Sequence, residues 1–145
     1  MTLKEIQQKI IDLLAADTTI NIKSDHGFYG PPLTKQETPF GFVRWTGGPL
    51  TVAAFGKKLW TQDFEVVMVE SSNVEDDAEK AVEDKVDAAR LLLDSNNTLA
   101  GLVQDSDVVS INGDVAFSGT DWGHIENIIA AGKLVLRVQI LGDLR

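Results

Sequence analysis

Few residues of this sequence have the types and spacing that chemistry requires. His26 and His124 are the only histidines, and each stands among turn-forming residues. A metal site built on histidine needs these side chains at short fixed spacings such as H-x-x-x-H, which neither histidine has. The chain contains no cysteine, so thiolate metal ligands, disulfides and a cysteine nucleophile are excluded. It also lacks the glycine-rich phosphate loops and the G-x-S-x-G nucleophile motif.

Three short acidic groups are the remaining candidates for binding a cation. Asp105 with Asp107, and Asn112 with Asp114, look like fragments of calcium loops but lack the EF-hand spacing. Asx residues of this kind also form turns, which we take as their role. Residues 75–77 are all acidic, and negative charge in the first turn of a helix complements the helix dipole. The sequence therefore predicts no catalytic, cofactor-binding or metal site, and no enzymatic activity.

Length and composition describe one globular domain with an acidic bias. The chain has 145 residues, of which 43% are hydrophobic and 24% charged, so it can bury a core of its own. Its formal net charge is −9, and residues 70–94 hold nine acidic and three basic side chains. This excess disfavours sequence-specific binding of nucleic acid, which needs a basic surface. A negatively charged surface would still allow DNA to pass along it without being bound, because the like charges repel each other.

The sequence also carries no mark of a membrane or secreted protein. No apolar run approaches the ~20 residues that span a bilayer. No charged-then-apolar leader opens the chain. We therefore expect no membrane partner and a location in the cytoplasm where the protein is made.

The elements that position every other residue are a strand and a long helix between Leu59 and Asp94. Residues 63–70 alternate with period two and are apolar on both faces, which is typical of a central strand. Residues 72–94 form an acidic helix with one apolar stripe. Small residues in this stripe predict that the helix lies flat on the strands. The stripe consists of Ala78, Val82, Val86, Ala89 and Leu93.

The remaining segments add one helix and several strands. Residues 3–16 predict an amphipathic helix that begins with a capping box of Thr2 and Glu5, and that turns Gln7 towards solvent. Residues 46–49 and 56–58 predict turns, so the strands around them form an antiparallel meander. Residues 125–131 are ambiguous, and could extend the last strand with a bulge near Gly132. The predicted strands are 40–45, 50–55, 59–70, 107–112, 115–117 and 134–141.

Together these elements predict an α+β fold in a single domain of residues 1–145. Its mainly antiparallel sheet has about four to six strands, with two helices packed on one face. Long loops and aromatic residues then mark possible contact surfaces. Phe28 and Tyr29 lie in the long segment 17–39, where contact with a partner and packing on their own domain are both open. Trp122 in a loop is an interface or core residue, whereas Trp45 and Trp60 in strands favour the core.

The order of these elements resembles a known family. The most specific part is Asn-x-Leu-x-Gly-Leu-Val at residues 97–103, which follows the acidic helix and precedes strands that close at 134–140. In this layout the chain resembles the tail terminator, or tail completion, and minor tail proteins of long-tailed phages. The resemblance covers most of the chain, although residues 17–39 do not follow its pattern.

The resemblance implies a structural virion protein of the phage head–tail junction. Copies would form a ring, typically a homohexamer, that caps the tail tube, stops its growth and joins the tail to the head. The implied partners are the tail tube protein, a head-completion or connector protein, and genome DNA that passes through the lumen without specific binding. The implied location is the virion tail, after assembly in the host cytoplasm. The candidate subunit or tail contacts are Phe28, Tyr29, Gly47, Gly48 and Trp122.

Two alternatives stay open at the level of sequence. The chain could be a small non-catalytic α+β binding or adaptor module of a cellular complex. Within the phage reading, the sequence does not separate a tail terminator from another neck or head-completion protein.

Overall fold

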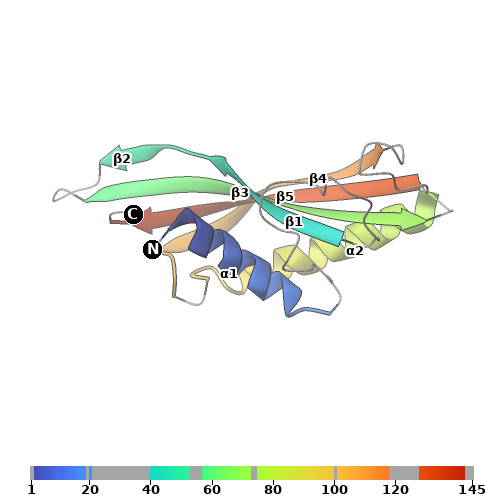
Figure 1. The fold of residues 1–145 in the computed structure, drawn as a ribbon, viewed down its shortest axis with the longest axis horizontal. Coiled ribbons are helices and arrows are strands. Elements are labelled where there is room, and N and C mark those ends of the chain that lie inside the picture. Colours follow the sequence, from blue (N-terminus) through green and yellow to red (C-terminus); the bar gives the residue numbers. More distant parts are fainter. Residues whose placement is uncertain are drawn as a thin grey trace.

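The protein folds into a five-stranded sheet with two helices, as an α+β domain (Figure 1). The computed structural model describes residues 2–18, 20, 40–52, 57–72, 75–99, 101–117 and 128–142. Every described strand pairing is antiparallel, in the order β1-β3-β5-β4, and β2 also pairs with β3. The predicted fold class is therefore confirmed. The elements are α1 (Leu3–Ala15), β1 (Phe40–Gly47), β2 (Leu50–Val52), β3 (Lys58–Ser72), α2 (Glu75–Asp94), β4 (Asp105–Phe117) and β5 (Ile128–Leu141).

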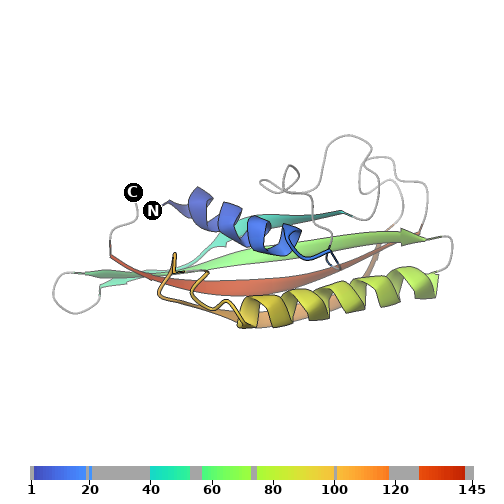
Figure 2. The same ribbon diagram turned by 90° about the horizontal axis from the view of Figure 1, so that it is seen from below.

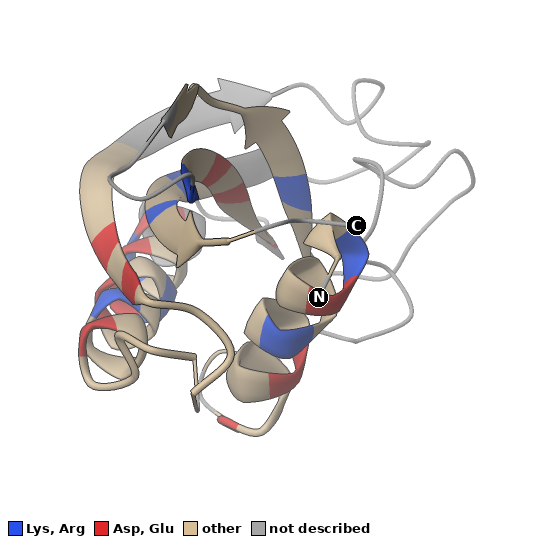
Figure 3. Cartoon of the chain, turned by 90° about the vertical axis from the view of Figure 1, so that its left-hand side faces the viewer, with Lys and Arg blue, Asp and Glu red and all other residues tan. Residues whose placement is uncertain are grey.

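Both helices cover the same face of the sheet. Helix α2 packs across β3, β4 and β5, whereas α1 lies against β1 and touches α2. Figure 2 shows the two helices on one side of the strands, and the end-on view in Figure 3 shows the sheet curving over them. Neither described helix is long and apolar enough to cross a membrane.

Period-two alternation in the central strands builds the core beneath these helices. Phe64, Val66 and Met68 of β3 turn towards the helices and are buried. Strand β3 is central, since it pairs with both β1 and β5, and Val67 and Val69 on its second face are also buried, as predicted. The predicted stripe of α2 packs on the same core, through Val82, Val86, Ala89 and Leu93. The helix itself begins later than expected, because Ser72 ends β3 opposite Ile128.

Helix α1 begins at the predicted capping box. The Glu5 amide donates to Thr2 Oγ1, and the Thr2 amide donates to the Glu5 carboxylate, both at 3.1 Å. One prediction about this helix is wrong, because Gln7 is buried and does not face solvent. Its Nε2 donates to the carbonyl oxygen of Val43 at 2.7 Å, which ties α1 to β1. The bond satisfies a polar group that would otherwise be costly to bury.

A glycine of the sheet sets the distance between α2 and β5. A Cβ added to Gly132 would lie 2.5 Å from Val82 Cγ1 and 2.8 Å from Val86 Cγ2. The close approach of α2 to β5 therefore depends on a glycine of the sheet that lies beneath two valines of the helix, and also on the alanines of the predicted stripe. Residues 128–141 form one strand that passes through Gly132 without a shift against β3. The predicted bulge lies in β4 instead, between Asn112 and Val115.

The predicted turn at residues 46–49 is also wrong. Strand β1 pairs with β3 from Phe40 opposite Val69 to Gly47 opposite Asp63, and β2 continues along β3 in the same direction. The path is irregular at a bulge at residues 45–47 and at residues 48–49, which separate β1 from β2. Residues 40–52 and β3 therefore form two arms of one long antiparallel hairpin, and the chain does not reverse at the glycines.

The segment that follows α2 turns the chain back onto the core. Leu99 is fully buried in a left-handed conformation with φ of 49°, and Val103 is buried beside the same core. Gly101 has φ of 88°, which favours glycine because a Cβ would be strained there. The Asn-x-Leu-x-Gly-Leu-Val residues thus form a turn whose two apolar side chains anchor it.

Candidate assembly surfaces

The described residues contain no arrangement that points to catalysis. No group of three His, Asp or Glu side chains in this part of the chain lies close enough to hold a metal ion. Asp105, Asp107 and Asn112 are strand residues of β4 and not members of loops, so the predicted turns are absent at these positions. His26 and His124 lie outside the described residues, and the side chains of residues 75–77 do as well.

Of the predicted contact residues, only the two glycines lie in the described structure. Phe28, Tyr29 and Trp122 fall outside it. Gly47 and Gly48 have φ of 98° and 158° and lie beside β3, within the long hairpin and not at its tip.

The face of the sheet that the helices leave open carries paired charges. Arg137 of β5 donates from Nε and one terminal nitrogen to the Asp63 carboxylate, at 3.0 and 3.2 Å. This hydrogen bond and the negative charge of Asp63 raise the pKa of Arg137. Lys133 binds Glu65 at 3.3 Å on the same face. Because these charges neutralise one another in pairs, the centre of the open face offers no net charge to a partner.

One end of the hairpin forms an exposed arm. We define the hairpin arm as residues 44–52 together with 57–60. Figure 2 shows that β2 and the start of β3 extend beyond the ends of both helices. Trp45 and Leu50 are each 47% exposed on this arm. Trp60 packs against the core as predicted, but the exposure of Trp45 contradicts its predicted place in the core.

The exposed Trp45 ring is held in place by a buried side chain. Its Nε1 donates to Gln62 Oε1 at 2.8 Å, and Gln62 is 3% exposed. Gln62 Nε2 in turn donates to the carbonyl oxygen of Gly48 at 3.1 Å. The ring therefore presents an apolar surface whose orientation is fixed before any partner arrives, which lowers the entropic cost of binding.

The hairpin arm is also basic, in a chain of net charge −9. Residues 40–60 contain Arg44, Lys57 and Lys58 but no Asp or Glu. All three side chains are exposed, and none forms an ion pair with another residue of the described ranges. Glu65 stands opposite Arg44 across the strands, but its carboxylate is bound to Lys133. The neighbouring helix α1 balances its own charges, through Lys4, Lys9, Glu5 and Asp12.

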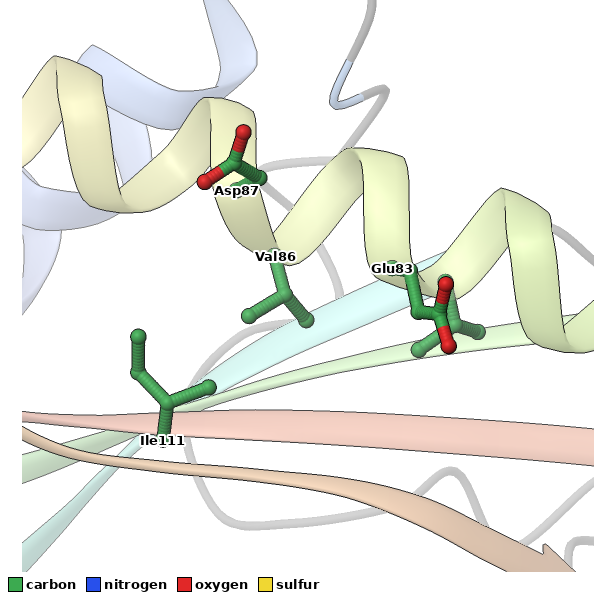
Figure 4. A pocket seen from close by; sticks show the side chains of 5 residues that line it. Glu83, Val86, Asp87 and Ile111 are labelled. Carbon is green, nitrogen blue, oxygen red and sulfur yellow. The ribbon is translucent and has the colours of Figure 1, made fainter.

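A second exposed surface lies at the opposite edge of the sheet, between α2 and β4. A shallow groove of about 210 Å³ is lined there by five residues (Figure 4). Ile111, 48% exposed, forms the sheet side of the groove, and Val86 points towards it from α2, which also carries Glu83 and Asp87. We call this surface the α2–β4 groove. Its lining residues are Val82, Glu83, Val86, Asp87 and Ile111.

The charge around the groove is negative. Glu83 and the neighbouring Asp84 are exposed and make no ion pair among the described side chains. Asp87 shares Arg90, at 3.0 Å, with Asp94 at 3.5 Å. Asp105 and Asp107 of β4 add nothing to this charge, because they stand opposite Gln139 and Arg137 and so lie on the open face of the sheet. Helix α2 as a whole holds eight acidic and three basic residues.

Sequence reasoning found neither surface as a unit. For the hairpin arm, the signal that could have indicated it is the absence of acidic residues from 40–60. The groove had no comparable signal, because the bulge between Val108 and Ser110 is what turns Ile111 onto the helix side, opposite Leu134.

Comparison with known proteins found no match: no protein-family model fits the chain, and no curated protein matches its sequence.

Proposed function

We propose that this protein is a structural virion subunit of the head–tail junction of a long-tailed phage. In this role its copies form a ring, typically a hexamer, that caps the tail tube, stops its growth and joins the tail to the head. The observation that supports the proposal is the architecture. The order of elements in which the chain resembles tail terminator proteins predicted an α+β fold with two helices packed on a mainly antiparallel sheet, and the chain has this fold. Residues 97–103, the most specific part of the resemblance, lead from α2 into β4.

The exposed surfaces fit a subunit that binds its neighbours. A closed ring needs two different complementary surfaces on every copy, because each subunit contacts the next one head to tail. The hairpin arm and the α2–β4 groove differ in charge and lie at opposite edges of the sheet. Genome DNA would pass through the lumen of such a ring without specific binding, since the chain carries a net charge of −9.

The direct test measures assembly of the purified protein. Sedimentation velocity over a range of protein concentrations, followed by negative-stain microscopy, should reveal rings or their concentration-dependent formation. Pre-formed tail tubes should bind the protein at one end and then fail to elongate when free tail tube protein is added. A protein that stays monomeric throughout and never binds tail tubes would refute the proposal. That result would favour the adaptor module of a cellular complex.

A genetic test separates the tail terminator from other neck proteins. In phage particles assembled without this protein, loss of a tail terminator leaves overlong tails without heads. Loss of a head-completion protein leaves tails of normal length beside unjoined heads. Genes for capsid, portal and tail tube proteins next to this one would support the proposal independently.

A further inference from the structure

We infer that copies of this chain associate head to tail, with the hairpin arm of one copy seated in the α2–β4 groove of the next. This inference rests on the proposed function, because it names the two surfaces by which a ring of these subunits would close. Both surfaces are exposed within the described structure, and they lie at opposite edges of the sheet.

The first argument is charge complementarity. Lys57 and Lys58 give the arm two adjacent positive charges, and Arg44 adds a third on its other face, opposite Glu65; none forms an ion pair among the described residues. The groove offers Glu83 and Asp87 among its lining residues, and Asp84 lies beside them. Contact between opposite charges speeds association and excludes wrong arrangements. Each copy therefore carries a basic edge and an acidic edge that match those of another copy.

The second argument is the apolar side chains that both surfaces expose. Register places Trp45 opposite Phe64 and Leu50 opposite Trp60, so Trp45 and Leu50 lie on the helix side of the arm. Lys58 follows the same alternation, two residues before Trp60. The arm thus presents two apolar groups with a lysine on one side. The groove presents the counterpart, an apolar floor of Val82, Val86 and Ile111 beside the acidic residues of α2.

The same charges select a head-to-tail arrangement over a symmetric dimer. A two-fold axis through the arms would bring Lys57 and Lys58 of both copies together, and an axis through the grooves would bring Glu83 and Asp87 together. Like charges in direct contact are unfavourable, whereas an arm in a groove pairs opposite charges. A contact between two different surfaces propagates from copy to copy, and it closes into a ring when the rotation allows.

Thiol crosslinking tests this contact, because the chain has no cysteine of its own. Leu50→Cys and Ile111→Cys place single thiols on the arm and in the groove at exposed positions, so folding should survive and circular dichroism checks this. Leu141→Cys is the matched control. Leu141 is 45% exposed at the same end of the sheet, but it pairs with Leu59 and so faces the opposite side.

The experiment mixes pairs of these variants with a short bis-maleimide crosslinker. Docking raises the effective concentration of the two thiols, so Leu50→Cys with Ile111→Cys should give at least ~10-fold more linked dimer than Leu141→Cys with Ile111→Cys. Each variant alone should give almost none. The chain that carries both Leu50→Cys and Ile111→Cys should give a ladder that ends at a closed ring. Raising the salt concentration should lower all yields, since salt screens exposed charges.

Charge reversal provides a second readout. Lys57→Glu with Lys58→Glu in one protein should abolish crosslinking to Ile111→Cys, and Glu83→Lys with Asp87→Lys in the partner should restore it. Strong self-crosslinking of a single variant, or a yield equal to the Leu141→Cys control, would overturn the inference. If the unmodified protein still forms rings in that case, the proposed function stands and only the surfaces are wrong. If it forms none, both fall.

Discussion

Substitution of Gly132 by alanine tests the contact on which the helix-to-sheet packing depends. The new Cβ would lie 2.5 Å from Val82 Cγ1 and 2.8 Å from Val86 Cγ2, whereas carbon atoms in favourable contact are about 3.5–4.0 Å apart. Valine side chains are stiff at χ1 and cannot swing away easily. Helix α2 must therefore lift from β5 by roughly 1 Å, or both valines must leave their rotamers. Overpacking of this kind costs about 1–3 kcal/mol of folding free energy.

A double-mutant cycle separates this clash from any other effect of the alanine. Val82→Ala removes the nearer methyl group and by itself costs about 2 kcal/mol, through lost burial and a small cavity. In the protein with both Gly132→Ala and Val82→Ala, the new methyl group fills part of that cavity. The double variant should therefore be more stable than the sum of the single effects predicts, by about 1 kcal/mol.

Urea unfolding gives these free energies. The three tryptophans report tertiary structure by fluorescence, and far-ultraviolet circular dichroism reports secondary structure. Coincidence of the two transitions confirms two-state unfolding, which the comparison requires. If Gly132→Ala lies within ~0.5 kcal/mol of the natural protein, or if the two substitutions are simply additive, the glycine does not set the helix-to-sheet distance.

Three further outcomes follow from single contacts. Lys85→Met should lower the free energy of unfolding by about 2–3 kcal/mol, because it leaves the Glu70 carboxylate without its cation in a pair whose side chains are each only 12% exposed. Replacing both partners with leucine should recover most of this loss, as measured by thermal unfolding. Gly48→Ala should prevent normal folding of the hairpin, because its Cβ would lie 1.9 Å from a carbonyl oxygen of β3. The Cβ of Gly47→Ala meets no atom within 4 Å, so this variant should lose only about 1–2 kcal/mol of unfolding free energy through backbone strain, as measured by urea unfolding. Gln7→Leu should cost about 1–3 kcal/mol by leaving a β1 carbonyl without its donor, and amide hydrogen exchange should rise selectively in α1 and β1.

Local chemistry made several features predictable from sequence. The capping box at Thr2, the apolar stripe of α2 and the alternation of the last strand each depend on residues a few positions apart. Their physical cause lies within one turn of helix or one stretch of strand, so the pattern alone indicates the structure. These elements, with their order, were sufficient for the α+β class and the two helices on one face.

Features that join distant residues were not predictable in this way. The pattern of glycines and proline at 46–49 favoured a turn, but the register with β3 carries the chain straight on. The sequence pattern places Gln7 on the surface of its helix, but in the structure its Nε2 lies 2.7 Å from the carbonyl oxygen of Val43 in β1. Trp45 reads as a core residue, yet the edge position of β1 leaves it half-exposed.

The sequence by itself determined that the chain is an acidic α+β domain with one basic stretch at 40–60, because composition and short-range periodicity carry that information. Only the tertiary structure decided what these charges do. Strand order places the basic stretch at one edge of the sheet and β4 at the other, and a bulge in β4 turns Ile111 towards the acidic helix α2. Strand order and register depend on pairings between residues far apart in the chain, which no local pattern encodes.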